Sequence, residues 1–272
     1  MMKLDDKVYN ISHTKLSTFR RCLQQFHWKY VDNYYPRPTL GQIRGSAGHA
    51  ALAEWHRSQD MSAAINKAWA KWSGEGLTED AEWNLLEKLL VNYFLWSVEN
   101  DKFRIIKSEF EFKLKFADEE IPIILTGFID GIVEEDKRLW LLENKFHKRA
   151  SAKNLDLDPQ VSIYMLGAIV NEIPVQGVIY NIVRVSDTKI AQTEPAIRSR
   201  LYRNPEGLDR ISAEILTQAK AMLRYELEGG IPYRNPTDDC SWDCPFYTAC
   251  LSMQDDNIEP TKILEKICER GD

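Results

Sequence analysis

The sequence has little cysteine, no excess of positive charge and no long apolar run. The first and last of these shortages exclude classes of protein, and the second removes one common sign of nucleic-acid binding. Its 272 residues include 5 cysteines, too few and odd in number for the disulfide framework of a small secreted domain. The net charge of -6 lacks the basic balance that is typical of nucleic-acid binding. No stretch approaches the roughly 18 apolar residues of a membrane span, and no secretory signal is visible. These absences predict a soluble, cytoplasmic protein without a membrane partner.

A full share of core-forming residues is present instead. The chain is 44% hydrophobic and 11% aromatic, which is enough to bury the core of one large domain. It contains no internal repeat and no low-complexity linker. We therefore expect a single domain over residues 1–272.

Apolar residues at three- and four-residue intervals predict helices over most of residues 1–100. The helices are expected over residues 12–31, 45–56, 61–72 and 81–99. The first of them places Cys22 on a helix.

From residue 103 the pattern changes to alternating and β-branched residues, which predict strands over 105–116, 121–133 and 138–146. A helix over 159–170, a strand over 175–185 and a helix over 205–229 follow. The expected fold is α/β, with a central mixed β-sheet flanked by helices. Its parts are a helical segment 1–100, a core 101–235 and a C-terminal segment 236–272.

The hairpin of residues 126–146 carries the candidate chemistry. Asp130 is predicted to end one apolar strand, and Glu143 and Lys145 to end the next, so that these side chains share one pocket. Paired carboxylates hold hard cations such as Mg²⁺, which support phosphodiester hydrolysis while a lysine serves the attacking water. For the isolated Glu-x-Lys tripeptide, a solvated ion pair is the better explanation. Charges that follow a buried strand, however, require partners, a metal or a site.

The cysteines form a second candidate site. Cys22 stands near one end of the sequence, whereas Cys240, Cys244 and Cys250 stand near the other. Four thiolates complete the ligand shell of a zinc ion or of an iron-sulfur cluster, and the residue types alone permit both. Cys268 is the expected spare.

Several stretches follow one another in a recognisable order: Ser12–Phe26 with Cys22, Gly45–His49, Gly127–Asp130 with Glu143–Lys145, Gln160–Tyr164, and Cys240–Cys250. This order resembles the PD-(D/E)XK nuclease superfamily. The likeness is specifically to its RecB-like branch with an iron-sulfur cluster, which includes the AddB nuclease domain and CRISPR-associated RecB-like exonucleases. The resemblance covers residues 12–250 and implies a restriction-endonuclease-like core.

The resemblance also implies roles for individual residues. Mg²⁺ or Mn²⁺ would be held by His49, Asp130, Glu143 and the backbone carbonyl of Asn144. Lys145 would serve the water, Gln160 would lie near the phosphate or Lys145, and Tyr164 near the DNA backbone. A [4Fe-4S] cluster would be held by Cys22, Cys240, Cys244 and Cys250.

The basic residues form two runs, which could either contact DNA or form a solvated face. Lys148, Arg149 and Lys153 follow the catalytic strand, where they are expected to contact DNA phosphates. Arg198, Arg200 and Arg203 form the other run. A solvated face is the simpler interpretation of such runs.

The resulting hypothesis is a metal-dependent DNA exonuclease. It would act on single strands or on the ends of duplexes in recombination, repair or end processing, phage-encoded systems included. The sequence leaves open a homo-oligomer and a recombination or helicase partner. Two other classes remain: a non-cleaving DNA-end-binding or CRISPR-adaptation-type subunit, and a zinc-stapled interaction protein.

Overall fold

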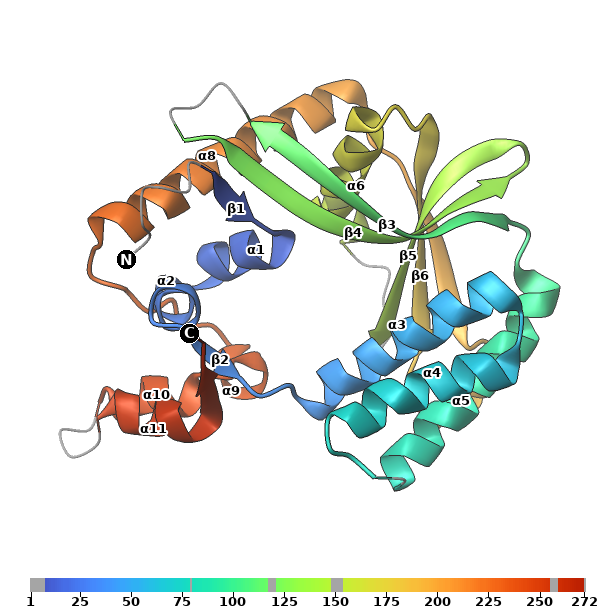
Figure 1. The fold of residues 1–272 in the computed structure, drawn as a ribbon, viewed down its shortest axis with the longest axis horizontal. Helices are drawn as coiled ribbons and strands as arrows, with labels where there is room; N and C mark the ends of the chain where they lie inside the picture. The colour runs from blue at the N-terminus through green and yellow to red at the C-terminus, as the bar shows by residue number, and fades with distance from the viewer. Residues whose placement is uncertain (1–7, 79, 117–120, 148–153, 255–258, 272) are drawn as a thin grey trace. The chain divides into compact units, whose positions relative to one another are not determined.

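The computed structural model describes residues 8–78, 80–116, 121–147, 154–254 and 259–271. The chain divides into two compact units. The terminal unit contains residues 1–38, 115–125 and 213–272, and the central unit contains residues 39–114 and 126–212. The colours in Figure 1 make the composition of the terminal unit visible, because blue and red segments occur together in it.

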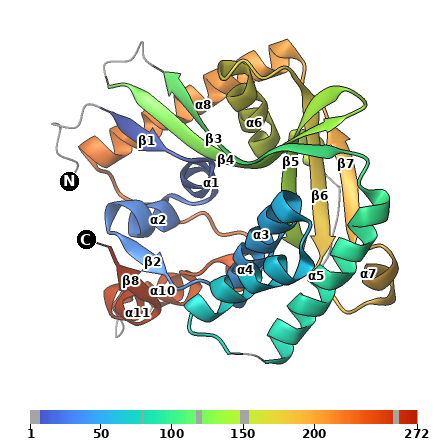
Figure 2. The same cartoon turned by 45° about the vertical axis from the view of Figure 1, so that its right-hand side comes forward.

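A mixed β-sheet forms the middle of the central unit. Its strands are β3 (Arg104–Phe116), β4 (Ile123–Glu135), β5 (Arg138–His147), β6 (Val175–Arg184) and β7 (Ala196–Leu201). The β4–β5 and β6–β7 pairs are antiparallel, β5–β6 is parallel, and β3 pairs with β4 (Figure 2). The predicted mixed sheet is confirmed, but β7 falls where the sequence showed only a basic run.

Helices cover both faces of this sheet. Helices α3 (Leu40–Ser58), α4 (Met61–Gly74) and α5 (Ala81–Asn100) share an apolar core with Val183 of β6 and Phe146 of β5. On the other face, Tyr180 of β6 donates to Asp158, the N-cap of α6 (Pro159–Val170), at 3.3 Å. Because alternate strand residues point to opposite faces, Val183 and Tyr180 distinguish the two helical layers.

Most helix bounds agree with the sequence prediction, and α6 has the predicted bounds. Helix α3 differs, since it begins at Leu40 rather than at Gly45. A capping box explains the earlier start: Thr39 accepts from the Gln42 N–H, and the Gln42 side chain accepts from the Thr39 N–H. No helix in the described part of the chain is long and apolar enough to cross a membrane.

The terminal unit gathers short elements from both ends of the sequence. Strand β1 (Tyr9–Ile11) pairs in parallel with the first residues of β4, and β2 (Tyr34–Pro36) pairs with β8 (Cys268–Arg270). Its helices are α1 (His13–Arg21), α2 (Leu23–Phe26) with the π-helical turn His27–Val31, α9 (Cys240–Asp243), α10 (Tyr247–Ser252) and α11 (Pro260–Ile267). Helix α8 (Pro205–Glu228) begins in the central unit and belongs to the terminal unit from residue 213.

The predicted continuous helix over residues 12–31 is wrong at Cys22. This residue is extended, with φ -163° and ψ 120°, and separates α1 from α2. The C-terminal segment supplies hydrogen bonds at the break: the Asn235 side chain donates to the Arg21 carbonyl at 2.8 Å, and the Gln24 N–H donates to the Tyr233 carbonyl at 3.0 Å. Partners so distant in the sequence leave no periodic signal, which is why the break escaped the sequence prediction.

Candidate active site

The sequence prediction that Asp130 ends a strand is wrong, because Asp130 lies within β4. The regular pairing of β4 with β5 runs from the hairpin turn to Gly131 opposite Leu142. At the next position the Asp130 side chain, not the β4 backbone, bonds to β5: its Oδ2 accepts from the Asn144 N–H at 2.6 Å. The carboxylate is thereby fixed to β5 beside Glu143.

His49 reaches the same carboxylate from helix α3. Its Nδ1 lies 3.1 Å from Asp130 Oδ1. The adjacent Gly48 allows the approach, because a Cβ atom there would lie 2.4 Å from the Phe146 ring of β5. Such a contact is too short for any side chain. Since Nδ1 faces Asp130, Nε2 is the His49 atom left for a ligand.

Glu143 and Lys145 form an ion pair on β5. Glu143 is 2% exposed, and the Lys145 ammonium contacts its carboxylate. Burial, reinforced by the negative charge of Asp130, raises the pKa of Glu143 to about 7 despite the nearby lysine. Glu143 therefore exchanges its proton near neutral pH.

The pKa of Asp130 is lowered and the pKa of His49 is raised, because each residue stabilises the charged form of the other. Burial alone would raise the pKa of Asp130, but the hydrogen bond and charge of His49 lower it. Burial alone would lower the pKa of His49, but the hydrogen bond to Asp130 and the negative charges nearby raise it. In the metal-free protein, the cationic forms of His49 and Lys145 thus offset the two carboxylates.

Helix α6 brings Gln160 and Tyr164 to this group. Asp158 caps the helix by accepting from the Gln160 N–H at 2.8 Å, and Pro159 occupies the first turn. The Gln160 side chain donates to the Tyr164 hydroxyl at 2.6 Å. Burial and the charges of Glu143 and Asp130 raise the pKa of Tyr164, so its hydroxyl keeps its proton.

These residues fit a hard divalent cation by the chemistry of their donors. Two carboxylates, an imidazole nitrogen and a backbone carbonyl are oxygen and nitrogen ligands suited to Mg²⁺ or Mn²⁺. Among the described residues, however, no three His, Cys, Asp or Glu side chains converge closely enough to hold an ion as they stand. Entry of a cation therefore requires that it replace the present contacts of His49 or Lys145 with the carboxylates.

The four candidate cluster cysteines line one cavity in the terminal unit. Cys22, Cys240, Cys244 and Cys250 surround a volume of about 170 Å³, walled on one side by the buried Phe246 ring. All four are free thiols. Burial raises the pKa of Cys244 and Cys250, and the neighbouring cysteines add to the shift. Four thiols around one cavity are the residue type that holds a zinc ion or an iron-sulfur cluster.

Other basic and acidic candidates lie apart from this constellation or outside the described residues. Lys148, Arg149 and Lys153 fall outside the described residues. Glu109 and Glu111, alternative carboxylates on the preceding strand, are exposed. The second basic run is a solvated face only in part, because Arg200 is exposed whereas Arg198 and Arg203 are half-buried. Arg198 pairs with Asp101, Arg200 with Glu135, and Arg203 with Ser162.

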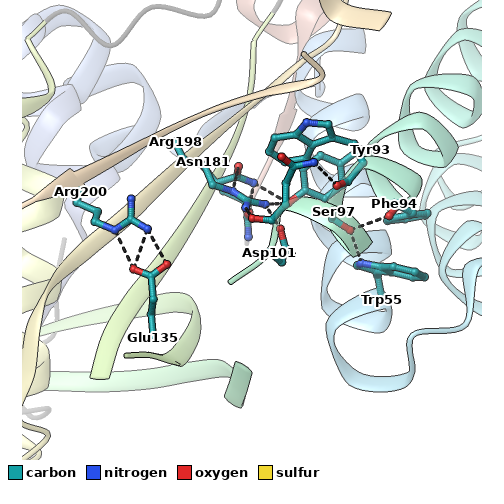
Figure 3. A network of polar contacts seen from close by, with 12 residues as sticks. Trp55, Tyr93, Phe94, Ser97, Asp101, Glu135, Asn181, Arg198 and Arg200 are labelled. Atoms are coloured by element: carbon teal, nitrogen blue, oxygen red, sulfur yellow. Dashed lines mark hydrogen bonds and ion pairs between the residues drawn. The ribbon is translucent and has the colours of Figure 1, made fainter. Parts of the chain in front are cut away.

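Sequence reasoning missed a polar group behind the site. Asn181 of β6 is fully buried, and its Nδ2 donates to Asn144 Oδ1 at 2.8 Å. Arg198 donates to Asn181 Oδ1 at 3.1 Å (Figure 3). A signal was available: asparagine is the one polar residue inside the apolar run Val178–Val183, and buried polar groups require partners.

Comparison with known proteins agrees with this architecture. The sequence profile described as the PD-(D/E)XK nuclease superfamily matches residues 10–251. None of the curated proteins matches the chain in sequence.

Two solved structures are similar to it. The first, from Eubacterium rectale and described as a predicted exonuclease, has 10% sequence identity, covers 88% of each chain and has a TM-score of 0.52, which shows a shared fold. The second, SSO0001, has 13% identity, covers 91% of this chain and 87% of its own, and has a TM-score of 0.39.

Proposed function

Because the chain belongs to the PD-(D/E)XK nuclease superfamily, we propose that it is a metal-dependent DNA exonuclease of the RecB-like type, braced by a [4Fe-4S] cluster. The observation that carries the proposal is the meeting of Asp130, His49 and Lys145 with the buried Glu143. A structural ion pair needs one acid and one base. Here two carboxylates adjoin one another, with an imidazole and a lysine beside them, and this donor set suits a divalent cation.

Asp130, Glu143, His49 Nε2 and the Asn144 carbonyl would hold the cation. When bound, it supplies charge neutralisation at the phosphate and lowers the pKa of a water molecule. Lys145 orients the attacking water from its position beside Glu143, and Gln160 and Tyr164 place hydrogen-bond donors at the phosphate. Lys148, Arg149 and Lys153 would neutralise DNA phosphates beyond the site.

The cluster assignment is supported by the arrangement of the cysteines. A zinc ion needs four ligands about one point, with sulfur roughly 2.3 Å from the metal. The four cysteines here line one cavity of about 170 Å³. A [4Fe-4S] cluster binds its four thiolates through separate irons and so accepts sulfurs spread around its volume.

Cleavage of DNA labelled at one end tests the proposal. Purified full-length protein is expected to release nucleotides or short products from an end in the presence of Mn²⁺, and to stop on addition of EDTA. Closed circular DNA of the same sequence serves as the matched substrate without ends. End binding without turnover would favour a non-cleaving subunit, whereas cleavage of circles would overturn the exonuclease assignment.

Binding of Mn²⁺ is expected to release protons near neutral pH. Metal ligands must be deprotonated, whereas the metal-free protein binds protons at Glu143, with a pKa of about 7, and at His49, whose pKa is raised. Mn²⁺ affinity should therefore rise with pH through the Glu143 pKa of about 7, and level off once Glu143 and His49 have both lost their protons. Below that pH it should fall by about tenfold per unit for each proton displaced.

Calorimetry in two buffers with different ionisation enthalpies measures the protons released. Release of at least about half a proton per ion at pH 6.5 is expected from the Glu143 pKa. Glu143→Gln, which cannot ionise, provides the control and should release fewer protons. Equal apparent enthalpies in the two buffers, or an affinity that does not vary between pH 6 and 8, would contradict this assignment of the ligands.

A further inference from the structure

A continuous line of polar contacts connects the candidate metal site with a partly buried ion pair between Asp101 and Arg198. It begins at Asp101, which follows α5, and passes through Arg198 of β7 and Asn181 of β6 to Asn144 of β5. The Asn144 N–H completes it by donating to Asp130. Figure 3 shows the Arg198, Asn181, Tyr93 and Asp101 side chains directed toward one another. We call Asp101, Arg198, Asn181 and Tyr93 the support network.

The donors and acceptors of the support network determine its orientation. An arginine can only donate, so the Asn181 atom that faces Arg198 Nε at 3.1 Å must be the carbonyl oxygen. The Asn181 amide nitrogen must then point the other way, where it meets the Tyr93 hydroxyl at 3.0 Å and Asn144 Oδ1 at 2.8 Å. The position of one arginine thereby dictates the orientation of the Asn144 side chain.

Burial makes the support network sensitive to loss of any member. Asn181 and Tyr93 are 0% exposed and Asn144 is 1% exposed, so water does not replace a lost partner. Arg198 is held by its ion pair with Asp101 and lies over the Trp96 and Phe103 rings, 4.7 and 5.2 Å from their centroids. The network is anchored at both ends and has little freedom to move.

We propose that Asn181, oriented by Arg198, is a positioning residue for the metal site, because it fixes Asn144 and through Asn144 the carboxylate of Asp130. This inference rests on the proposed function, since it assigns Asn144 and Asp130 to the cation. Asn181 itself touches neither of the two carboxylates. Its effect is transmitted by the hydrogen bond to Asn144, and outer partners of this kind alter metal affinity by roughly 10–100-fold.

The same face of β7 provides a matched control. Arg200 lies two residues after Arg198 and forms a bidentate ion pair with Glu135, with Nε–Oε2 at 2.9 Å and Nη2–Oε1 at 2.6 Å. This pair is drawn apart from the support network in Figure 3. Like Arg198, Arg200 lies on β7 and pairs with a carboxylate. Its hydrogen bonds within the described part of the chain go to Glu135 and not to Asn181 or Asn144.

A double-mutant cycle on Mn²⁺ affinity tests the proposal. The dissociation constant is measured by calorimetry on the protein without DNA, for the wild type, Asn181→Ala, Asn144→Ala and the double variant. Asn181→Ala should weaken binding about tenfold or more when Asn144 is present, and less than about twofold when it is absent. Arg200→Gln should leave the affinity within about twofold of wild type, while Arg198→Gln should weaken it as Asn181→Ala does.

Equal losses in the two Asn144 backgrounds, or an unchanged affinity in Asn181→Ala, would overturn the proposal. If Asn181→Ala does not fold, Tyr93→Phe replaces it, since this variant removes one oxygen and keeps the ring. A weakening of about threefold that requires Asn144 is then expected. A wild-type protein that binds no Mn²⁺ would instead contradict the proposed function, so the two failures are distinguishable.

Discussion

Replacement of Lys145 by alanine should reduce the rate of DNA cleavage by roughly 10²- to 10⁴-fold, the range for loss of a group that handles the proton of the nucleophile. Lys145 is paired with Glu143 and is 26% exposed in its side chain. It therefore reaches both the buried carboxylates and solvent, as a residue that serves an attacking water must. Single-turnover cleavage of end-labelled DNA with saturating Mn²⁺ measures the rate.

Mn²⁺ affinity distinguishes a chemical role from a structural one. Removing the Lys145 charge takes a cation away from the carboxylates, so binding of Mn²⁺ should be unchanged or tighter. Lys113→Ala is a suitable control, because Lys113 lies exposed on β3 and pairs with Glu111. Equal cleavage rates in Lys145→Ala and wild type would remove Lys145 from the mechanism, and weaker Mn²⁺ binding would indicate damage to the site.

Replacement of Cys22 by serine should cause the largest loss of stability. Because the metal-binding free energy of a structural site contributes to folding, loss of one thiolate should release the cluster and loosen the terminal unit. A cost of several kcal/mol would lower the Tm by at least about 10 °C in a chain of this size. Anaerobically purified wild type is expected to be brown and to contain iron and sulfide, while Cys22→Ser should contain little of either.

Cys268 provides the matched control within the same unit. It is also a free cysteine and is buried, but it does not line the cavity of the other four. Cys268→Ser should therefore keep its iron and lose only about 1 kcal/mol of stability, as expected for a polar oxygen in place of a buried sulfur. A colourless wild type loaded with zinc would overturn the cluster assignment, as would full iron content in Cys22→Ser.

The parts of the fold with local signals could be predicted from the sequence. Helix α6 has the predicted bounds because Asp158 and Pro159 encode its start. The mixed sheet followed from alternating and β-branched runs. Strand β7 was missed because its arginines are polar by type. Arg198 pairs with Asp101, which follows α5, and Arg200 pairs with Glu135 of β4, and no local pattern reveals such distant partners.

The residues of the candidate site could be named from the sequence, but the contacts that hold them in place could not. Asp130, Glu143 and Lys145 were named from one hairpin, and the structure brings His49 to them from α3. The position of Asp130 inside β4 depends on the Asn144 N–H, and that of Asn144 on Asn181. Such contacts join three separate strands, whereas sequence periodicity reports only which face a residue occupies.

The break at Cys22 also constrains the order in which the chain can fold. The hydrogen bonds that hold α1 and α2 apart come from Tyr233 and Asn235, which a ribosome adds after the whole central unit. Until then, residues 12–31 are free to follow their own periodicity and form one continuous helix. The central unit can therefore be complete first, and the cysteine cavity can close only after synthesis has passed Cys250. Cofactor insertion would then be a late event that follows folding of the central unit.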